Sequence, residues 1–220
     1  MKISKFLHSC LLVEKSDGKL LFDPGKFSFV EGLVRPEEFR DISAIVLTHD
    51  HPDHLDLEVL KKIVDQNANA EVLTNSETVT KLAEAGLSAK VHEDGIRQVG
   101  GFSLKAIPAK HNAILGQEPP QNTAYLIDGV LLNPGDSFSA ELYEYAGVNV
   151  LIVPVMAPWG NELQMMNFAE AMQPHTVVPV HDGHAKAFFI AQRYETFEKE
   201  FEKRSMKFAN LQQAGSSFHC

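Results

Sequence analysis

The stretch Thr48-His49-Asp50-His51-Pro52-Asp53-His54 gathers three imidazoles and two carboxylates within seven residues. It follows the apolar run 44–47, which predicts a buried strand, and Asp56 with the apolar positions after it predicts a capped helix. The stretch is therefore expected on a strand-to-helix loop. Imidazole nitrogen and carboxylate oxygen suit zinc, iron or manganese, whereas calcium and magnesium sites are built from oxygen alone. These residues predict a transition-metal site.

The spacing within the stretch is compatible with two metal positions. His49 and His51 are two residues apart in extended chain, so their side chains point to the same side and can share an ion. Pro52 turns the chain and redirects Asp53 and His54 toward a second position. The alternative, a polar surface loop without a metal, is disfavoured by the density of ligand types.

The pattern His-x-His-x-Asp-His resembles the motif of the metallo-β-lactamase superfamily of metal-dependent hydrolases. The resemblance implies a later His, an Asp in a Gly-Asp turn and a final His, each at the end of a strand. The segments Ala106-Ile107-Pro108-Ala109-Lys110-His111, Leu131-Leu132-Asn133-Pro134-Gly135-Asp136-Ser137 and Val177-Val178-Pro179-Val180-His181 match these three. It further implies that His49, His51 and His111 hold a first metal, that Asp53, His54 and His181 hold a second, and that Asp136 bridges them.

Two segments near the N-terminus resemble one branch of that superfamily, the ascorbate-6-phosphate lactonase-like proteins. They are His8-Ser9-Cys10 and Phe22-Asp23-Pro24, although Leu7 stands where the branch usually has Gly. The resemblance implies that Asp23 fixes the tautomer of a metal-ligating His, whereas a plain turn residue is the other interpretation. His8 is either a strand histidine satisfied by its neighbours or part of the pocket wall.

Composition limits the class of protein. The chain has 220 residues, 44% hydrophobic and 22% charged, and is expected to form one globular domain over residues 1–220, which the resemblance implies is a hydrolase domain. No apolar run is long enough to span a bilayer and no signal peptide is visible, so a cytoplasmic protein without a membrane partner is expected, with Cys10 and Cys220 reduced. The net charge of −9 argues against nucleic acid, and a homo-oligomer is left open.

The order of expected elements predicts an α/β (α+β) protein, a four-layer αββα sandwich of the metallo-β-lactamase type. One long strand is expected over residues 3–14, and the final helix over residues 186–204. His92 is expected at the surface. The expected strands are 3–14, 19–22, 44–47, 71–74, 89–92, 102–108, 122–127, 130–132, 148–155 and 177–181, and the expected helices follow Asp56, Asn75, Ser139 and Ala185.

Two loops are expected at the metal edge. The segment 112–121 begins directly after a proposed ligand and has no periodicity, so it is the candidate substrate loop. The segment 156–160 carries Trp159, which is either a substrate platform or packed against its own protein. His184, three residues after His181, is a candidate proton donor to the leaving group, with solvation as the other interpretation.

The implied chemistry is hydrolysis by a bridging hydroxide on two divalent transition-metal ions, zinc foremost, with manganese or iron as alternatives. Asp53 could accept a proton from the attacking oxygen. A carboxylate at Asp136 argues against zinc β-lactamases, which use Cys there, and the acidic balance argues against transfer-RNA processing. A small, anionic lactone or phosphodiester remains as the small-molecule substrate. An iron-dependent oxidoreductase of the same superfamily and a metal-stabilised binding protein without turnover stay open.

Overall fold

A computed structural model, which describes residues 1–220, contains two mixed β-sheets of seven strands each. The first sheet has the order β14-β1-β2-β3-β4-β5-β6 and the second the order β13-β12-β11-β10-β9-β8-β7. The first comprises β1 (Lys2–Lys5), β2 (Leu11–Lys15), β3 (Gly18–Phe22), β4 (Ala44–Val46), β5 (Glu71–Thr74), β6 (Lys90–Val91) and β14 (Ser216–His219). The second comprises β7 (Gly95–Val99), β8 (Phe102–Pro108), β9 (Thr123–Ile127), β10 (Leu131–Asn133), β11 (Val150–Pro154), β12 (Thr176–Val180) and β13 (Lys207–Phe208).

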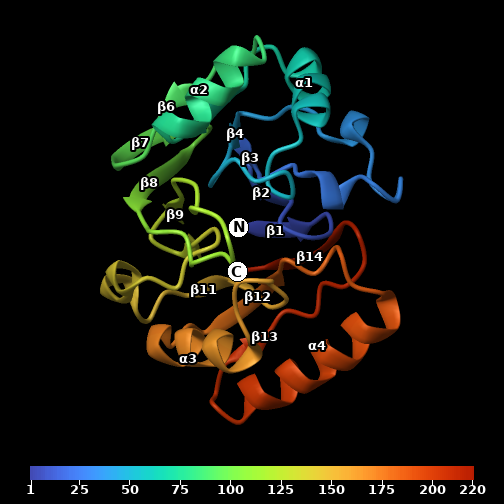
Figure 1. The fold of residues 1–220 in the computed structure, drawn as a ribbon, viewed down its shortest axis with the longest axis vertical. Helices are drawn as coiled ribbons and strands as arrows, with labels where there is room; N and C mark the ends of the chain where they lie inside the picture. Colours follow the sequence, from blue (N-terminus) through green and yellow to red (C-terminus); the bar gives the residue numbers. More distant parts are fainter.

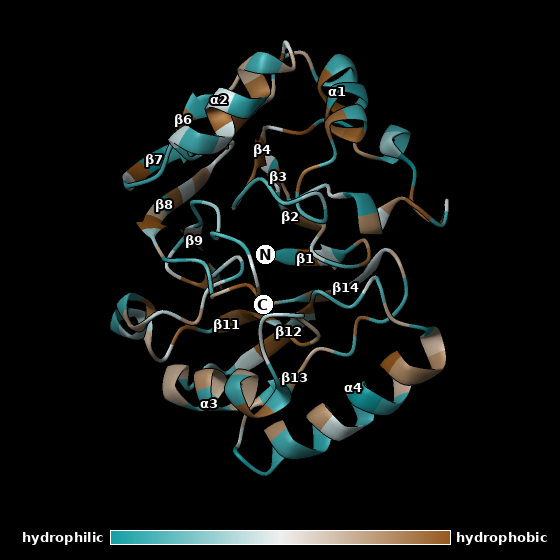
Figure 2. Ribbon diagram, viewed as in Figure 1, coloured by the Kyte–Doolittle hydropathy of each residue, from teal (hydrophilic) through white to brown (hydrophobic).

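Four α-helices cover the outer faces of the sheets (Figure 1): α1 (Leu57–Gln66) and α2 (Ser76–Glu84) on one side, α3 (Glu162–Met172) and α4 (Ala187–Glu202) on the other. Short 3-10 helices occupy Lys26–Ser28, Pro36–Glu38 and Ala140–Tyr145. The helices change between hydrophilic and hydrophobic along their length (Figure 2), as amphipathic helices on a sheet do. No helix is long and apolar enough to cross a lipid bilayer.

Three apolar clusters hold the layers together. A central cluster joins the inner faces of both sheets, for example Val13 and Leu20 from the first with Leu104 and Val178 from the second. A second cluster lies between the second sheet and α3 and α4, and a third between the first sheet and α1 and α2. The order of layers is helix, sheet, sheet, helix, which confirms the predicted four-layer αββα sandwich.

The helix that follows the histidine motif begins where the sequence predicts. The Asp56 side chain accepts hydrogen bonds from the backbone N–H groups of Glu58 and Val59 at the start of α1. Val59, Leu60 and Ile63 are buried against the first sheet. The motif is thereby held between a buried strand, β4, and a capped helix packed on the same sheet.

Two expectations about the scaffold were wrong, and one helix was missed. The predicted strand 3–14 is interrupted after Lys5, because Leu7 and His8 adopt left-handed backbone with φ of 62° and 45°. His92 is buried rather than exposed, and its Nε2 lies 3.1 Å from the carbonyl oxygen of Leu104. Helix α3 was not expected, although its Asn161–Gln164 capping box was a readable start signal.

Candidate metal centre

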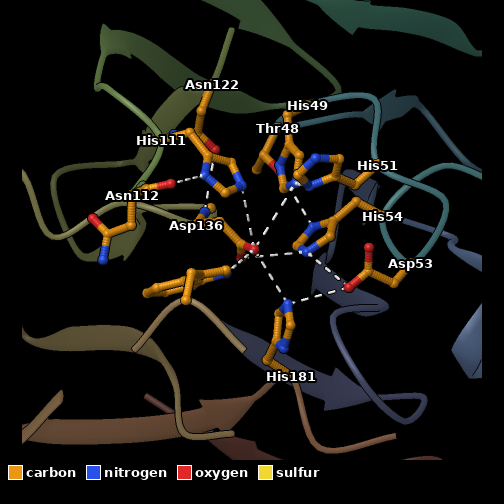
Figure 3. Close-up of polar contacts among 12 residues, drawn as sticks. Thr48, His49, His51, Asp53, His54, His111, Asn112, Asn122, Asp136 and His181 are labelled. Carbon is orange, nitrogen blue, oxygen red and sulfur yellow. Dashed lines mark hydrogen bonds and ion pairs between the residues drawn. The ribbon is translucent and has the colours of Figure 1, made fainter. Parts of the chain in front are cut away.

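The histidine motif and its predicted partners meet at one edge of the sandwich, between the two sheets (Figure 3). The motif follows β4 of the first sheet. His111, Asp136 and His181 follow β8, β10 and β12 of the second sheet, respectively. Because each of these strands ends at the same edge, side chains that are up to 132 residues apart along the chain converge.

One group of ligand-capable atoms comprises His49, His51, His111 and Asp136. The Nε2 atom of His49 lies 3.1 Å from Nδ1 of His51. Nε2 of His111 lies 3.5 Å, and Nε2 of His49 lies 4.0 Å, from Oδ2 of Asp136. All four ligand atoms lie within 4.8 Å of one another, a separation that one ion between them can span.

A second group comprises His8, Asp53, His54 and His181. Nε2 of His181 lies 3.2 Å from Oδ2 of Asp53 and 3.2 Å from Oδ2 of Asp136. Nε2 of His54 lies 3.3 Å from Oδ1 of Asp136. Asp136, a member of the first group, therefore also contacts His54 and His181 of the second, at the position where the family resemblance implies a bridging carboxylate.

Hydrogen bonds at the far side of three rings fix which nitrogen faces the centre. Nδ1 of His54 donates to Oδ2 of Asp23 at 2.9 Å, because a carboxylate can only accept. Nδ1 of His111 donates to the carbonyl oxygen of Asn112 at 2.6 Å, and Nδ1 of His181 to that of Met156 at 2.9 Å. Each ring therefore presents an unprotonated Nε2 toward the centre when it is neutral.

When the rings are neutral, those three Nε2 atoms are, like Oδ1 of Asp136, buried acceptors without a hydrogen-bond donor within the protein. A buried polar atom without a partner costs about 1–3 kcal/mol, so four that converge on one point require a partner of another kind. Three neutral imidazole nitrogens and a carboxylate oxygen fit a divalent transition-metal ion.

The electrostatics of the centre are those of buried carboxylates that attract positive charge. Burial opposes a proton on His181, but Asp136 and Asp53 outweigh burial and raise the pKa of His181 to about 10. Burial also opposes protonation of His54, and Asp136 and Asp23 raise its pKa well above its usual value. The pKa of Asp136 lies well below its usual range, because His181 and His54 outweigh the effect of burial. The carboxylates are therefore ionised, and cations are favoured between them.

Asp136 is held from two further sides. Gly135 has a φ of 60°, and a side chain at that position would collide with the Asn122 amide, whose Oδ1 accepts from the Asp136 backbone N–H at 3.2 Å. The indole N–H of Trp159 donates to Oδ2 of Asp136 at 2.7 Å. Trp159 thus contacts the centre directly, a contact that neither sequence interpretation of this residue specified.

The remaining candidates lie around the centre. Asp23 accepts from both the backbone N–H and the hydroxyl of Thr48, each at 2.8 Å, in addition to holding His54. The exposed ring of His184 lies 6.0 Å from that of His181. In the candidate substrate loop 112–121, Asn112 supports His111, and Leu115 is 99% exposed. Sequence reasoning missed Thr48, and also the carbonyl groups that orient His111 and His181, because backbone acceptors leave no mark in a sequence.

Known proteins resemble this chain over most of its length. The family model for the beta-lactamase superfamily domain matches residues 2–181. Protein Rv0786c of Mycobacterium tuberculosis is 32% identical over 191 residues, which cover 83% of this chain and 84% of that protein. A UPF0173 metal-dependent hydrolase of Pyrococcus abyssi is 27% identical over 191 residues, with 80% and 83% covered.

Solved structures with the same fold include Igni18, a metallo hydrolase from Ignicoccus hospitalis. It has a TM-score of 0.73 and 19% identity, over 100% of this chain and 98% of that one. CmlA, a diiron β-hydroxylase from Streptomyces venezuelae, has a TM-score of 0.71 and 15% identity, and this chain covers 54% of it. At these identities, the likeness concerns the fold alone.

Proposed function

Since this chain belongs to the beta-lactamase superfamily and is a metal-dependent hydrolase, we propose that it works through a centre of two divalent transition-metal ions. His49, His51 and His111 would hold the first ion, Asp53, His54 and His181 the second, and Asp136 would bridge them. The two groups of converging ligand atoms support this assignment, with Asp136 in contact with both. Zinc is the ion we favour, with manganese and iron as alternatives, and residues 1–220 are taken as one domain.

The observation that carries the proposal is the convergence of partnerless buried atoms. Nε2 of His54, His111 and His181 and Oδ1 of Asp136 point at one centre without a hydrogen-bond partner. Two divalent cations would satisfy all four at once. They would also replace the protons that the carboxylates hold on His181 and His54 in the metal-free protein.

Bound ions would supply a hydroxide from water near neutral pH and would polarise the bond to be cleaved. The protein's own residues would manage protons around that chemistry. Asp53 is half-buried and lies at the centre, where it could take up a proton from the attacking oxygen. His184 is exposed at the rim, where it could give a proton to the leaving group and recover one from solvent.

We propose a small-molecule substrate with a lactone or phosphodiester bond. A cavity of about 560 Å³ opens beside His184 and is lined by residues including Met156, Pro158, Leu163 and Phe189. Its lining contains neither Lys nor Arg nor any of the proposed metal ligands, so an anionic group of the substrate would have to extend past His184 to be held by the metal ions. The net charge of −9 supports a small molecule rather than nucleic acid as the partner, and a homo-oligomer is compatible with the proposal.

An iron-dependent oxidoreductase is the second candidate function. Its specific support is that imidazoles and carboxylates ligate iron as readily as zinc, and that a diiron β-hydroxylase shares this fold. A binding protein without turnover has no such support.

Metal content and turnover, measured on the same sample, test the proposal. We expect about two zinc or manganese ions per chain after loading, and hydrolysis within a panel of lactones and phosphodiesters. Two bound iron ions with oxygen consumption and no hydrolysis would favour the oxidoreductase. One ion per chain under saturating zinc and manganese would contradict the two-metal centre.

A further inference from the structure

His8 lies in the turn between β1 and β2 and is fully buried. Its Nε2 atom lies 3.0 Å from Oδ2 of Asp53, inside the second group of ligand-capable atoms. Two roles fit that position. An unprotonated Nε2 could ligate a metal, whereas a protonated Nε2 would donate a hydrogen bond to the carboxylate.

The other ring nitrogen decides between these roles. The backbone N–H of Gly183 points at Nδ1 of His8 with a separation of 3.0 Å. A backbone N–H can only donate, so Nδ1 must be the unprotonated acceptor, and the hydrogen of a neutral ring lies on Nε2. This is the reverse of His54, His111 and His181, whose Nδ1 atoms face acceptors.

We propose that His8 is a positioning residue, which donates an Nε2–H hydrogen bond to Asp53 and does not ligate a metal. The inference rests on the proposed two-metal centre. Oδ2 of Asp53 also lies 3.2 Å from Nε2 of His181, so this oxygen faces the second metal position. A carboxylate oxygen has two lone pairs, and His8 engages one of them while the other stays directed at the ion.

The turn that carries His8 is held in an unusual conformation that serves this contact. Leu7 and His8 have φ of 62° and 45°, a region that costs a residue with a side chain on the order of 1 kcal/mol or more. The Ser28 hydroxyl donates to the Leu7 carbonyl at 3.0 Å, and the His181 N–H donates to the His8 carbonyl at 3.3 Å. The turn is therefore tied to the loop of a proposed ligand.

The backbone of Gly183 packs so closely against His8 that no side chain fits between them. A Cβ atom at position 183 would lie 2.8 Å from Cβ of His8, closer than real Cβ contacts. Only glycine lets the N–H approach Nδ1 without displacing the ring. The donor that sets the His8 tautomer is thus built into the turn that follows His181.

Replacement of His8 by Gln and by Glu separates the two roles, because these side chains share shape and differ in what they offer. Gln can donate to Asp53 but is a poor metal ligand, whereas Glu can ligate but cannot donate. His8→Leu removes both abilities. The measurement is zinc titration of each metal-free protein, with elemental analysis of the loaded form.

We expect His8→Gln to bind two ions, with the Kd of the weaker ion within about threefold of the wild-type value. His8→Leu and His8→Glu should raise that Kd about 10–100-fold, the usual effect of losing a group that orients a ligand. If Glu retained the affinity that Gln loses, His8 would be a ligand and the proposal would be wrong. The proposal would also be wrong if His8→Leu had the same Kd for the weaker ion as wild type, or if His8→Gln had a Kd as high as that of His8→Leu.

Two controls keep the outcome decisive. If His8→Glu does not fold, the comparison of Gln with Leu still decides whether the donor matters. A wild-type protein that never binds a second ion would contradict the proposed two-metal centre and the His8 proposal together. A wild type with two ions, and no difference between Gln and Leu, would contradict only the role of His8.

Discussion

A buried charged cluster beneath the last metal loop gives a quantitative prediction about stability. Lys5 on β1 is 1% exposed, and its Nζ lies 2.6 Å from Oδ2 of Asp182 and 2.7 Å from the hydroxyl of Tyr194. The Tyr194 hydroxyl donates to the same Asp182 oxygen at 2.5 Å. The cluster joins the first sheet, the loop after His181 and α4. No sequence pattern predicted it.

Lys5→Met should be strongly destabilising, because it leaves the Asp182 carboxylate buried with a tyrosine hydroxyl as its remaining partner. Removing one member of a buried ion pair costs about 3–5 kcal/mol. In a chain of this size each kcal/mol lowers Tm by about 2–4 °C, so a fall of roughly 6–20 °C is expected. The double variant Lys5→Met with Asp182→Leu removes both charges and should recover most of that loss.

Urea unfolding of the metal-free proteins, followed by circular dichroism, measures these differences. Burial opposes ionisation of Asp182, but Lys5 outweighs it and holds the pKa of Asp182 below its usual value. A carboxyl group with a depressed folded pKa stabilises the protein above its unfolded pKa near 4, and that contribution is lost as pH falls. Without Lys5, burial raises the pKa of Asp182 in the folded variant, so the difference in stability between wild type and Lys5→Met should begin to narrow above pH 4 as the pH falls.

If Lys5→Met lowered the free energy of unfolding by less than about 1 kcal/mol, this reasoning would be refuted. The pair would then contribute no more stability than an exposed ion pair does. So would a double variant that is no more stable than the less stable single variant. That result would mean that the charges of Lys5 and Asp182 contribute to stability independently of each other.

Four further predictions concern the metal centre and its loops. Asp136→Ala should lose at least one ion and reduce hydrolysis more than about 100-fold, whereas exposed His175→Ala should change neither, and equal losses in both would contradict the ligand assignment. Because the pKa of metal-free His181 is raised to about 10, zinc must displace a proton there, and zinc affinity should rise from pH 6 to pH 8. A zinc affinity that does not change over this pH range would count against the centre. Trp159→Phe keeps an apolar ring but removes the N–H on Asp136, which should slow turnover about tenfold with both ions retained, and an unchanged rate would leave the contact without a role. Exchange of the 112–121 loop for a Gly-Ser linker should raise KM or alter substrate preference without metal loss, and an unchanged preference would place selectivity elsewhere.

The parts of the fold that the sequence predicted are those governed by local rules. The apolar run before His49 forms β4, and Asp56 caps α1, because strand patterning and capping depend on residues a few positions apart. The convergence of His111, Asp136 and His181 was anticipated through the family resemblance and strand ends. The four-layer order was predicted from the order of strands and helices together with the family resemblance.

The parts that were missed depend on contacts between distant residues. Position 8 was placed within a continuous strand because nothing local marks its left-handed turn, and its hydrogen-bond donor, Gly183, is 175 residues away. His92 was expected at the surface, but its ring is held by Leu104, and its carbonyl accepts from the Tyr125 hydroxyl at 2.9 Å. A polar side chain is predicted to be exposed unless the hydrogen-bond partner that permits its burial is known.

The three buried non-glycine residues with left-handed backbone all lie at or beside the centre. His8, Asp23 and His181 are buried residues with φ of 45°, 44° and 69°, and each such conformation costs on the order of 1–3 kcal/mol. They persist because each side chain is bound at its far end: His8 by the Gly183 N–H, Asp23 by Thr48, and His181 by a carbonyl group. The same contacts set the direction of the nitrogen that His181 presents to the centre, of the nitrogen that His8 presents to Asp53, and of the carboxylate with which Asp23 holds His54. Since a relaxed backbone at any of the three would turn its side chain away, the strained backbone and the orientation of the proposed ligand His181 and of its supporting residues His8 and Asp23 have one cause.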